Sequence, residues 1–377
     1  MRITHVIPAL TKGGAERVVV DLANAAVEEG HNVTLVAAIP AAAELIAHKL
    51  RPQVRLRYVS GRSIRRSYLQ LVPWLIRERS FLFRQDVIHC HLTFGSVFAA
   101  AFQRLRRLSK REQPAVVETY HAVGMAIPDS ERARHAFLLR GRDAVAFMAD
   151  DPYWRRFAAM NPRTIFRTIL NGVAAPEPAT REDRDRYRKA NSIPLHAHAV
   201  VGTVSRLVSA RRPDLVLEAF RYIASELGPG VHLLMAGEGP QRSMLERTAK
   251  DHGITSQVHL PGLVLDPAVP ISLMDIYLTV NVGRTTGIAA IEAALLGVPI
   301  LALQLQSGYR AEAEDWIWSS PDPRELGSKA VELLADRQAL AALAARQTAH
   351  ARARFSARAM ADAYSELYQA ALQRQPS

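Results

Sequence analysis

The chain has 377 residues, 49% of them apolar, and its charged residues are mixed throughout. This composition favours two folded domains over a disordered chain. Because no run of about 18 apolar residues occurs, we expect no transmembrane helix. The net charge of +12 fits an anionic membrane or an anionic substrate. Nucleic acid is excluded as the expected partner, because no zinc-ligand spacing, aromatic RNP-like strand or basic zipper accompanies the charge.

Strands and helices alternate along the first half of the chain. The strands are predicted at residues 3–7, 32–37, 54–59, 86–90, 115–119, 143–148 and 165–170. Helical stretches lie between most of them, and the first carries Val19, Leu22 and Ala26 on one face. This alternation predicts a parallel, doubly wound sheet.

The segment Ser60–Arg77 within this half interleaves arginines with Tyr68, Leu71, Trp74 and Leu75. A basic, partly apolar surface with an interfacial tryptophan is typical of peripheral membrane proteins. A solvated arginine-rich surface is the alternative interpretation.

A second alternating series follows a turn-rich linker at Asn171–Pro178. Its strands are predicted at residues 199–204, 231–236, 258–260, 276–280 and 300–303, with helices at 213–227, 241–252, 287–296 and 325–335. Two helix-rich segments, around 339–354 and 357–372, close the chain. We therefore expect two α/β domains, at residues 1–172 and 173–355, with a cleft between them and a C-terminal helix at 356–377.

Polar residues follow the predicted strands of the first domain, where ligands of such sheets bind. Gly13 and Gly14 let the backbone approach a phosphate or a sugar. His121 follows a strand on a loop, where it can donate a hydrogen bond to a ligand, whereas we expect His89 to lie in the core. A zinc site of His89, His91 and His121 is conceivable, although no cysteine or carboxylate cluster supports it.

The second domain offers groups that suit a nucleoside diphosphate. Arg206 and Arg211 lie between a strand and a helix that begins at Pro213, and each can hold phosphate oxygens; a solvated basic turn is the alternative. Gly287 precedes an apolar helix whose first N–H groups attract phosphate, and Glu292 in that helix can bind ribose hydroxyls. An ordinary buried helix is the alternative there. Two further turns allow close approach of a ligand to the backbone, at Gly237 and Gly262.

With these residues in view, the chain resembles the GT-B glycosyltransferases, and within them the retaining family 4, over essentially its full length. The resemblance rests on the order and spacing of Lys12–Arg17, Thr119–His121, Asn171–Val173, Arg206 with Arg211, Gly237–Pro240 and Gly287–Pro299. It implies two Rossmann-like domains facing a cleft, an acceptor domain followed by a donor domain, with the last helix crossing back onto the first.

The resemblance also implies an activity: metal-independent transfer of a sugar from a nucleotide-sugar with retention of configuration, to a saccharide or a lipid-linked acceptor in polysaccharide or glycolipid synthesis. Arg206 and Arg211 would hold the diphosphate and Glu292 the ribose. His121 and the loop at Gly13 and Gly14 would face the donor sugar and its phosphate. No cofactor or metal is expected, since the arginines and the helix start at Gly287 can stabilise the leaving phosphate.

One position departs from the family pattern. Arg284 stands where the family usually has a glutamate that reads the donor sugar, and Thr285 and Thr286 replace a glycine and an aromatic residue. Arg284 could read an acidic or unusual sugar, or it could turn away and leave the sugar to Thr286 and the backbone. Two other functions stay open: a nucleotide-sugar epimerase of the same architecture, and a catalytically degenerate sugar-binding scaffold of a polysaccharide assembly complex, which Arg284 keeps open.

The location follows from weaker signals. Met1–Pro8 is too short and too soon interrupted by proline for a signal peptide, and the single cysteine, Cys90, suits a reducing compartment. We expect a cytoplasmic protein that binds the inner face of the cell membrane peripherally.

Overall fold

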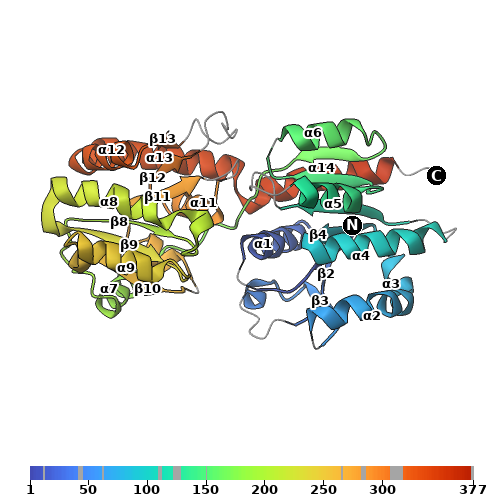
Figure 1. Cartoon of the computed structure of the whole chain (residues 1–377). Coiled ribbons are helices and arrows are strands. Elements are labelled where there is room, and N and C mark those ends of the chain that lie inside the picture. The colour runs from blue at the N-terminus through green and yellow to red at the C-terminus, as the bar shows by residue number, and fades with distance from the viewer. Residues whose placement is uncertain are drawn as a thin grey trace. The chain divides into compact units, whose positions relative to one another are not determined.

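The computed structural model describes residues 1–11, 13–40, 46–61, 63–108, 113–121, 129–149, 151–264, 266–281, 286–305 and 317–374. The chain divides into two compact units (Figure 1): residues 1–174 together with 354–377, and residues 175–353. The boundaries expected from the sequence, after residues 172 and 355, lie within about two residues of these. No helix in the described ranges is both long enough and apolar enough to span a bilayer.

A seven-stranded parallel sheet forms the first unit. Its order is β3-β2-β1-β4-β5-β6-β7. The strands are β1 (Arg2–Ile7), β2 (Asn32–Ala37), β3 (Arg55–Tyr58), β4 (Val87–His91), β5 (Ala115–Tyr120), β6 (Ala144–Phe147) and β7 (Ile165–Thr168). The predicted doubly wound sheet is thus confirmed. The strand order reverses between β1 and β4, which pair with each other.

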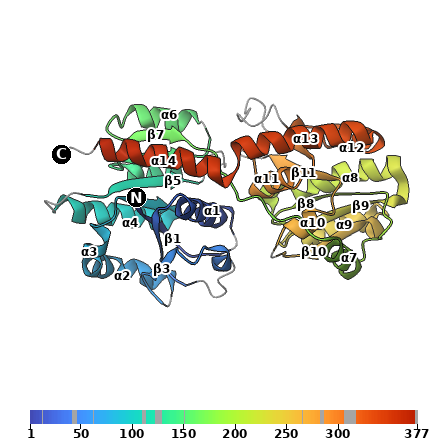
Figure 2. The ribbon, with the colours of Figure 1, turned by 180° about the vertical axis from the view of Figure 1, so that it is seen from behind.

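The two faces of this sheet differ in chemistry because successive side chains of a strand point to opposite faces. One face is apolar, with Val6, Ile88 and Cys90 packed against helices α2 (Ile64–Arg77), α3 (Arg79–Leu82) and α4 (Leu92–Arg107). The other carries His5 and His89 and lies against α14 (Ala357–Gln373), which packs beside α1 (Gly14–Glu28) and crosses the sheet in Figure 2. The remaining helices of the unit are α5 (Asp129–Leu139) and α6 (Pro152–Ala159).

A six-stranded parallel sheet of order β10-β9-β8-β11-β12-β13 forms the second unit. The strands are β8 (Ala199–Val204), β9 (Val231–Ala236), β10 (Val258–Gly262), β11 (Ile276–Asn281), β12 (Ile300–Gln304) and β13 (Trp318–Ser320). The edge strand β13 is absent from the sequence expectation, because three residues are too few to show an alternating pattern.

Helices cover both faces of the second sheet. The main core lies where α8 (Pro213–Leu227), α9 (Arg242–Asp251) and α12 (Pro323–Ala335) bring Phe220, Leu245 and Leu326 onto it. Met274, which follows α10 (Ala268–Ile271), packs against Gly202 on the opposite face. The other helices are α7 (Arg181–Ala190), α11 (Ile288–Leu295) and α13 (Arg337–Arg354). The sequence did not predict α7, which buries no side chain and so has no apolar period.

Candidate functional site

Both sheets reverse their strand order once, between β1 and β4 in the first unit and between β8 and β11 in the second. Open α/β sheets bind ligands beyond the carboxyl ends of the strands at such a reversal. The residues singled out from the sequence follow these strands: Gly13 and Gly14 come after β1, Arg206 after β8, and Gly287 after β11. Each unit therefore has its own candidate ligand edge.

The loop after β8 brings two arginines together. Arg206 and Arg211 are both exposed, and a short 3-10 turn at Ser209–Arg211 connects the loop to α8. The pKa of Arg211 is lowered because its surroundings desolvate it and because the positive charge of Arg206 lies close by. Two like charges held together in this way suit an anion that neutralises both. Arg212, by contrast, is already paired with Asp214 at 2.8 Å.

Backbone hydrogen bonds near Gly237 and Gly262 connect the loops that follow β8 and β9 with the end of β10. The N–H of Gly237 donates to the carbonyl of Gly262 at 2.8 Å, and the N–H of Leu207 donates to the carbonyl of Glu238 at 3.0 Å. Both glycines have positive φ, +148° and +83°, and a Cβ on Gly237 would overlap the carbonyl oxygen of Ser205. These glycines are therefore required by the backbone of the loops that frame Arg206, whatever they offer to a ligand.

The start of α11 is the second part of this ligand edge. Gly287 is its N-cap, and among the described residues, which do not include 282–285, no side chain caps the helix and no atom lies where a Cβ of Gly287 would be. Glu292 in the second turn is only 4% exposed, and Thr286 is also buried. An uncapped helix start leaves N–H groups for an anion. Arg284, the residue that departs from the family pattern, lies outside the described residues.

Tyr277 on β11 connects these parts, and the sequence analysis did not identify it. Its hydroxyl donates to the carbonyl of Val204 at 3.0 Å and lies 3.1 Å from the N–H of the same residue, directly before the Arg206 loop. Burial raises the pKa of Tyr277 to about 12, with a further contribution from the charge of Glu292. Glu292 and Arg211 both act on Tyr277 electrostatically, so the three side chains share one neighbourhood.

In the first unit, the carboxylate of Glu16 lies against the loop at Gly13 and Gly14. Gly13 is the N-cap of α1, Gly14 is its first residue, and a Cβ on Gly13 would overlap the carboxylate of Glu16. That carboxylate accepts a hydrogen bond from the Thr11 hydroxyl at 2.8 Å. A carboxylate in this place would repel a phosphate, but it can accept a hydrogen bond from a sugar hydroxyl.

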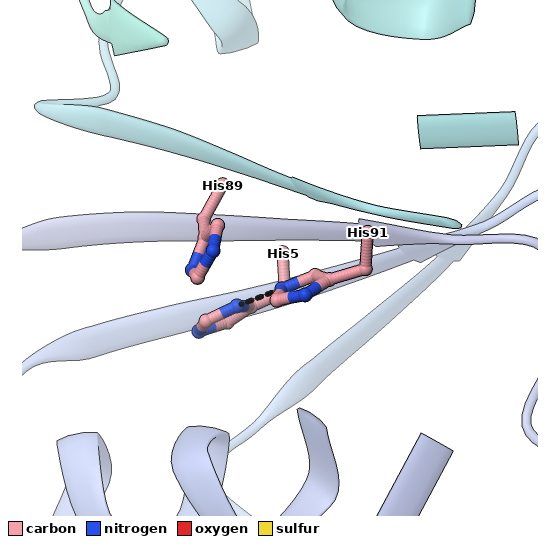
Figure 3. Close-up of side chains that lie close together, drawn as sticks. All are labelled: His5, His89 and His91. Carbon is pink, nitrogen blue, oxygen red and sulfur yellow. Dashed lines mark hydrogen bonds between the residues drawn. The ribbon is translucent and has the colours of Figure 1, made fainter. Parts of the chain in front are cut away.

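Four histidines lie on the polar face of the first sheet (Figure 3 draws three of them). His5, His89 and His91 are fully buried, and one nitrogen of each lies within 4.8 Å of one nitrogen of the other two. His121, directly after β5, is partly exposed. Burial is the main cause that lowers their pKa values: that of His5 to about 3, that of His121 to about 4, and those of His89 and His91 well below the ordinary value.

Hydrogen bonds connect these histidines. Nδ1 of His5 and Nε2 of His91 lie 3.1 Å apart, and Nδ1 of His91 and Nε2 of His121 lie 3.2 Å apart. Both nitrogens of His89 bond to hydroxyls at 2.7 Å, those of Tyr368 and Thr119. His89 is therefore a core residue, as its place within a strand indicated. The structure groups His5 with His89 and His91, whereas the sequence analysis named His121 as the third member of a conceivable zinc set.

The family comparisons match both units. Residues 12–183 match the family model described as Glycosyltransferase Family 4, and residues 198–336 match that described as Glycosyl transferases group 1. The chain is 30% identical over 207 residues to a D-inositol 3-phosphate glycosyltransferase of Corynebacterium urealyticum, which is 51% of this chain and 47% of that protein. It is 25% identical over 141 residues to the 2-deoxystreptamine N-acetyl-D-glucosaminyltransferase of Streptomyces fradiae, 37% of this chain and 33% of that protein. The matches thus span a third to a half of these relatives.

The solved structures show the fold. HepE of Anabaena, solved in complex with UDP and glucose, matches with a TM-score of 0.76 at 17% identity, over 98% of this chain and 99% of that one. The sucrose-phosphate synthase of Thermosynechococcus elongatus matches with a TM-score of 0.74 at 16% identity over the whole of both chains. These similarities confirm the predicted GT-B architecture.

Proposed function

We propose that this protein, which belongs to the group 1 glycosyl transferases of glycosyltransferase family 4, transfers a sugar from a nucleoside-diphosphate sugar to a saccharide or a lipid-linked acceptor. The observation that carries the proposal is the ligand edge of the second unit. There, two exposed arginines, a helix start that no described side chain caps and a buried carboxylate gather where the strand order reverses. A diphosphate needs the first two, and a ribose can use the third.

Each group has a separate role toward the donor. Arg206 and Arg211 hold the diphosphate, since a guanidinium offers paired N–H groups to phosphate oxygens. The N–H groups at the start of α11 after Gly287 add a second positive end. Glu292 accepts hydrogen bonds from the ribose hydroxyls. In the first unit, His121 and the loop at Gly13 and Gly14 face the donor sugar, and the carboxylate of Glu16 favours a hydroxyl there over a phosphate.

The chemistry we propose needs no metal and retains the configuration of the sugar. The bond from the anomeric carbon to the phosphate oxygen breaks, the acceptor oxygen bonds to the same face of that carbon, and the leaving phosphate takes the acceptor's proton. The barrier falls because Arg206, Arg211 and the helix start stabilise the charge that develops on the phosphate. No enzyme nucleophile is required.

An exposed surface of α2 supports our proposal that the protein binds a membrane. Exposed on α2 are the apolar residues Leu69, Val72 and Ile76 beside Tyr68, with Arg65, Arg66 and Arg77 around them; we call this the α2 surface. Leu71, Trp74 and Leu75, which the sequence analysis assigned to the membrane, are instead buried in the core. Exposed apolar and basic side chains on one helix suit an anionic lipid surface. We propose that the protein binds the inner face of the cell membrane and meets a lipid-linked saccharide there.

A panel of nucleotide-sugars, with and without a lipid-linked acceptor, tests the function. Transfer, or slow release of nucleoside diphosphate, supports the proposal. Interconversion of the sugar without an acceptor would instead show an epimerase, and binding without turnover would show a scaffold. The panel should include acidic donor sugars, because Arg284 in place of a carboxylate favours a donor with a negative group.

A further inference from the structure

Three histidines of the first unit form a continuous hydrogen-bonded chain that begins deep in the core and ends at the ligand edge. His5 bonds through Nδ1 to Nε2 of His91, and His91 bonds through Nδ1 to Nε2 of His121. The two atoms at the ends of the chain, Nε2 of His5 and Nδ1 of His121, are buried and have no hydrogen-bond partner in the described structure.

The number of protons fixes how such a chain can be arranged. The rings are neutral near pH 7, since burial lowers the pKa of His121 to about 4 and that of His5 to about 3. Each neutral ring carries one proton, on one of its two nitrogens. Because both bonds join Nδ1 of one ring to Nε2 of the next, all three rings must carry the proton on the same nitrogen, either Nδ1 or Nε2.

The two arrangements differ in where an N–H group is left without an acceptor. With all protons on Nε2, that group is at His5, which is fully buried. With all protons on Nδ1, it is at His121, whose Nδ1 is also buried, although the residue as a whole is partly exposed at the carboxyl edge of β5. A buried N–H without an acceptor is rarer than an acceptor without a donor. The arrangement with Nδ1–H throughout is therefore favoured, because its free donor belongs to the histidine at the ligand edge, where a bound ligand can supply an acceptor, and not to the histidine in the core.

The same histidines do not suit a divalent metal ion. Both nitrogens of His89 already bond to hydroxyls. The thiol of Cys90 and the carboxylate of Glu118 lie on the opposite face of the sheet, where Glu118 pairs with Arg142 at 2.7 Å. A divalent metal ion would thus bring two positive charges into a buried site where no anion among the described residues balances them.

We propose that His5 and His91 are positioning residues that hold His121 as a neutral hydrogen-bond donor, with its proton on Nδ1, toward an oxygen of the donor substrate. The role of His121 toward the donor rests on the proposed function, whereas the arrangement of protons does not. A neutral donor can bind a hydroxyl or a phosphate oxygen without a change in the charge of the site.

Nitrogen-15 NMR of the full, ligand-free chain labelled at histidine tests this directly. Near pH 7, His5, His91 and His121 should all show a protonated Nδ1 and an unprotonated Nε2. Two variants of equal shape sharpen the test. In His91→Asn, the amide N–H can still donate to Nε2 of His121, so Nδ1 of His121 should stay protonated. In His91→Asp, the carboxylate can only accept, so Nε2 of His121 should become protonated.

Several results would overturn the proposal. They are a mixture of proton positions among the three rings, protons on Nε2 throughout, or identical His121 signals in folded His91→Asn and His91→Asp. Bound metal at one equivalent, whose removal by a chelator shifts the signals of His5 and His91, would also overturn it. If neither variant folds, the wild-type spectrum alone decides. Because no ligand is needed, a failed proposal on His121 is distinguishable from a failure to transfer sugar.

Discussion

The hydroxyl of Tyr277 binds both backbone groups of Val204, its N–H at 3.1 Å and its carbonyl at 3.0 Å. Val204 ends β8 immediately before the loop that carries Arg206. Tyr277→Phe keeps the ring but leaves these two groups without their partner, so we expect a loss of about 1–3 kcal/mol in stability and weaker binding of nucleoside diphosphate. Chemical unfolding and calorimetry measure the two effects. Tyr222→Phe in α8 is the matched control, and equal behaviour of both variants would contradict a role for the Tyr277 hydroxyl.

Arg206 should matter for the diphosphate, whereas Arg212 should not. Charge-assisted hydrogen bonds are worth about 1.5–3 kcal/mol, so Arg206→Ala should weaken nucleoside-diphosphate binding at least about tenfold. Arg212→Ala removes the same charge a few residues away, but its side chain is already paired with Asp214. Calorimetry on both folded variants separates a specific contact from a general loss of positive charge. Equal losses would mean that Arg206 acts only through its charge.

Glu292 should distinguish a ribose from a deoxyribose. Glu292→Gln removes a negative acceptor that is 4% exposed, so it should weaken a ribonucleoside diphosphate more than its 2′-deoxy analogue. The comparison of the two ligands with each protein cancels any general effect on folding. If both ligands lose the same affinity, Glu292 supports the structure around Tyr277 instead of binding the sugar.

The buried histidines should make the first unit sensitive to acid. The pKa of His5 is about 3 and that of His121 about 4 in the folded protein, below the ordinary 6.5. The unfolded chain therefore takes up more protons, so the stability present above pH 6.5 is lost as the pH falls toward 4. His5→Asn should reduce the slope of unfolding free energy against pH by about 1.4 kcal/mol per pH unit in that range. An unchanged slope would show that His5 is not held neutral.

The α2 surface should bind anionic lipid. Leu69→Glu removes an apolar contact worth about 1.5–3 kcal/mol and adds a repulsive charge, so binding to anionic vesicles should fall at least about tenfold. Binding of the wild type should also weaken with salt, because exposed charges are screened. Leu195→Glu is the matched control, since Leu195 is exposed on the second unit. Cosedimentation that responds alike to both variants would exclude the α2 surface.

The sequence was sufficient for the strands and their order of appearance, because buried parallel strands give apolar runs between helical periods. It was not sufficient for β13, which is too short, or for α7, which buries nothing. For the candidate site, the sequence allows residues after the strands to be proposed, because ligand edges carry recognisable glycines, arginines and histidines. Tyr277 and His5 were missed because each lies within a strand, where its pattern is that of a core residue. Their contacts, to Val204 and to His91, depend on strand pairing that a single sequence does not contain.

The membrane assignment shows the same limit. The sequence indicates a segment rich in arginine and apolar residues. Apolar residues expected at the membrane, among them Trp74, are buried, whereas Leu69 on the other side of the helix is exposed. Trp74 lies in the core, where its indole N–H donates to the carbonyl of Tyr58 at 3.1 Å, while Leu69 is 81% exposed. An amphipathic pattern predicts which residues share a face of a helix. Because both faces of α2 carry apolar residues, only the structure shows which face is buried.

We propose that this protein transfers a sugar from a nucleotide-sugar with retention of configuration and without a metal. Proton NMR of donor hydrolysis in excess chelator is the decisive measurement, because it needs no acceptor and reads the configuration of the released sugar before it equilibrates in water. We predict that nucleoside diphosphate is released in the presence of chelator and that the free sugar appears first as the anomer present in the donor. Release of the opposite anomer first would contradict retention, and no release until magnesium or manganese is added would contradict metal-independent transfer.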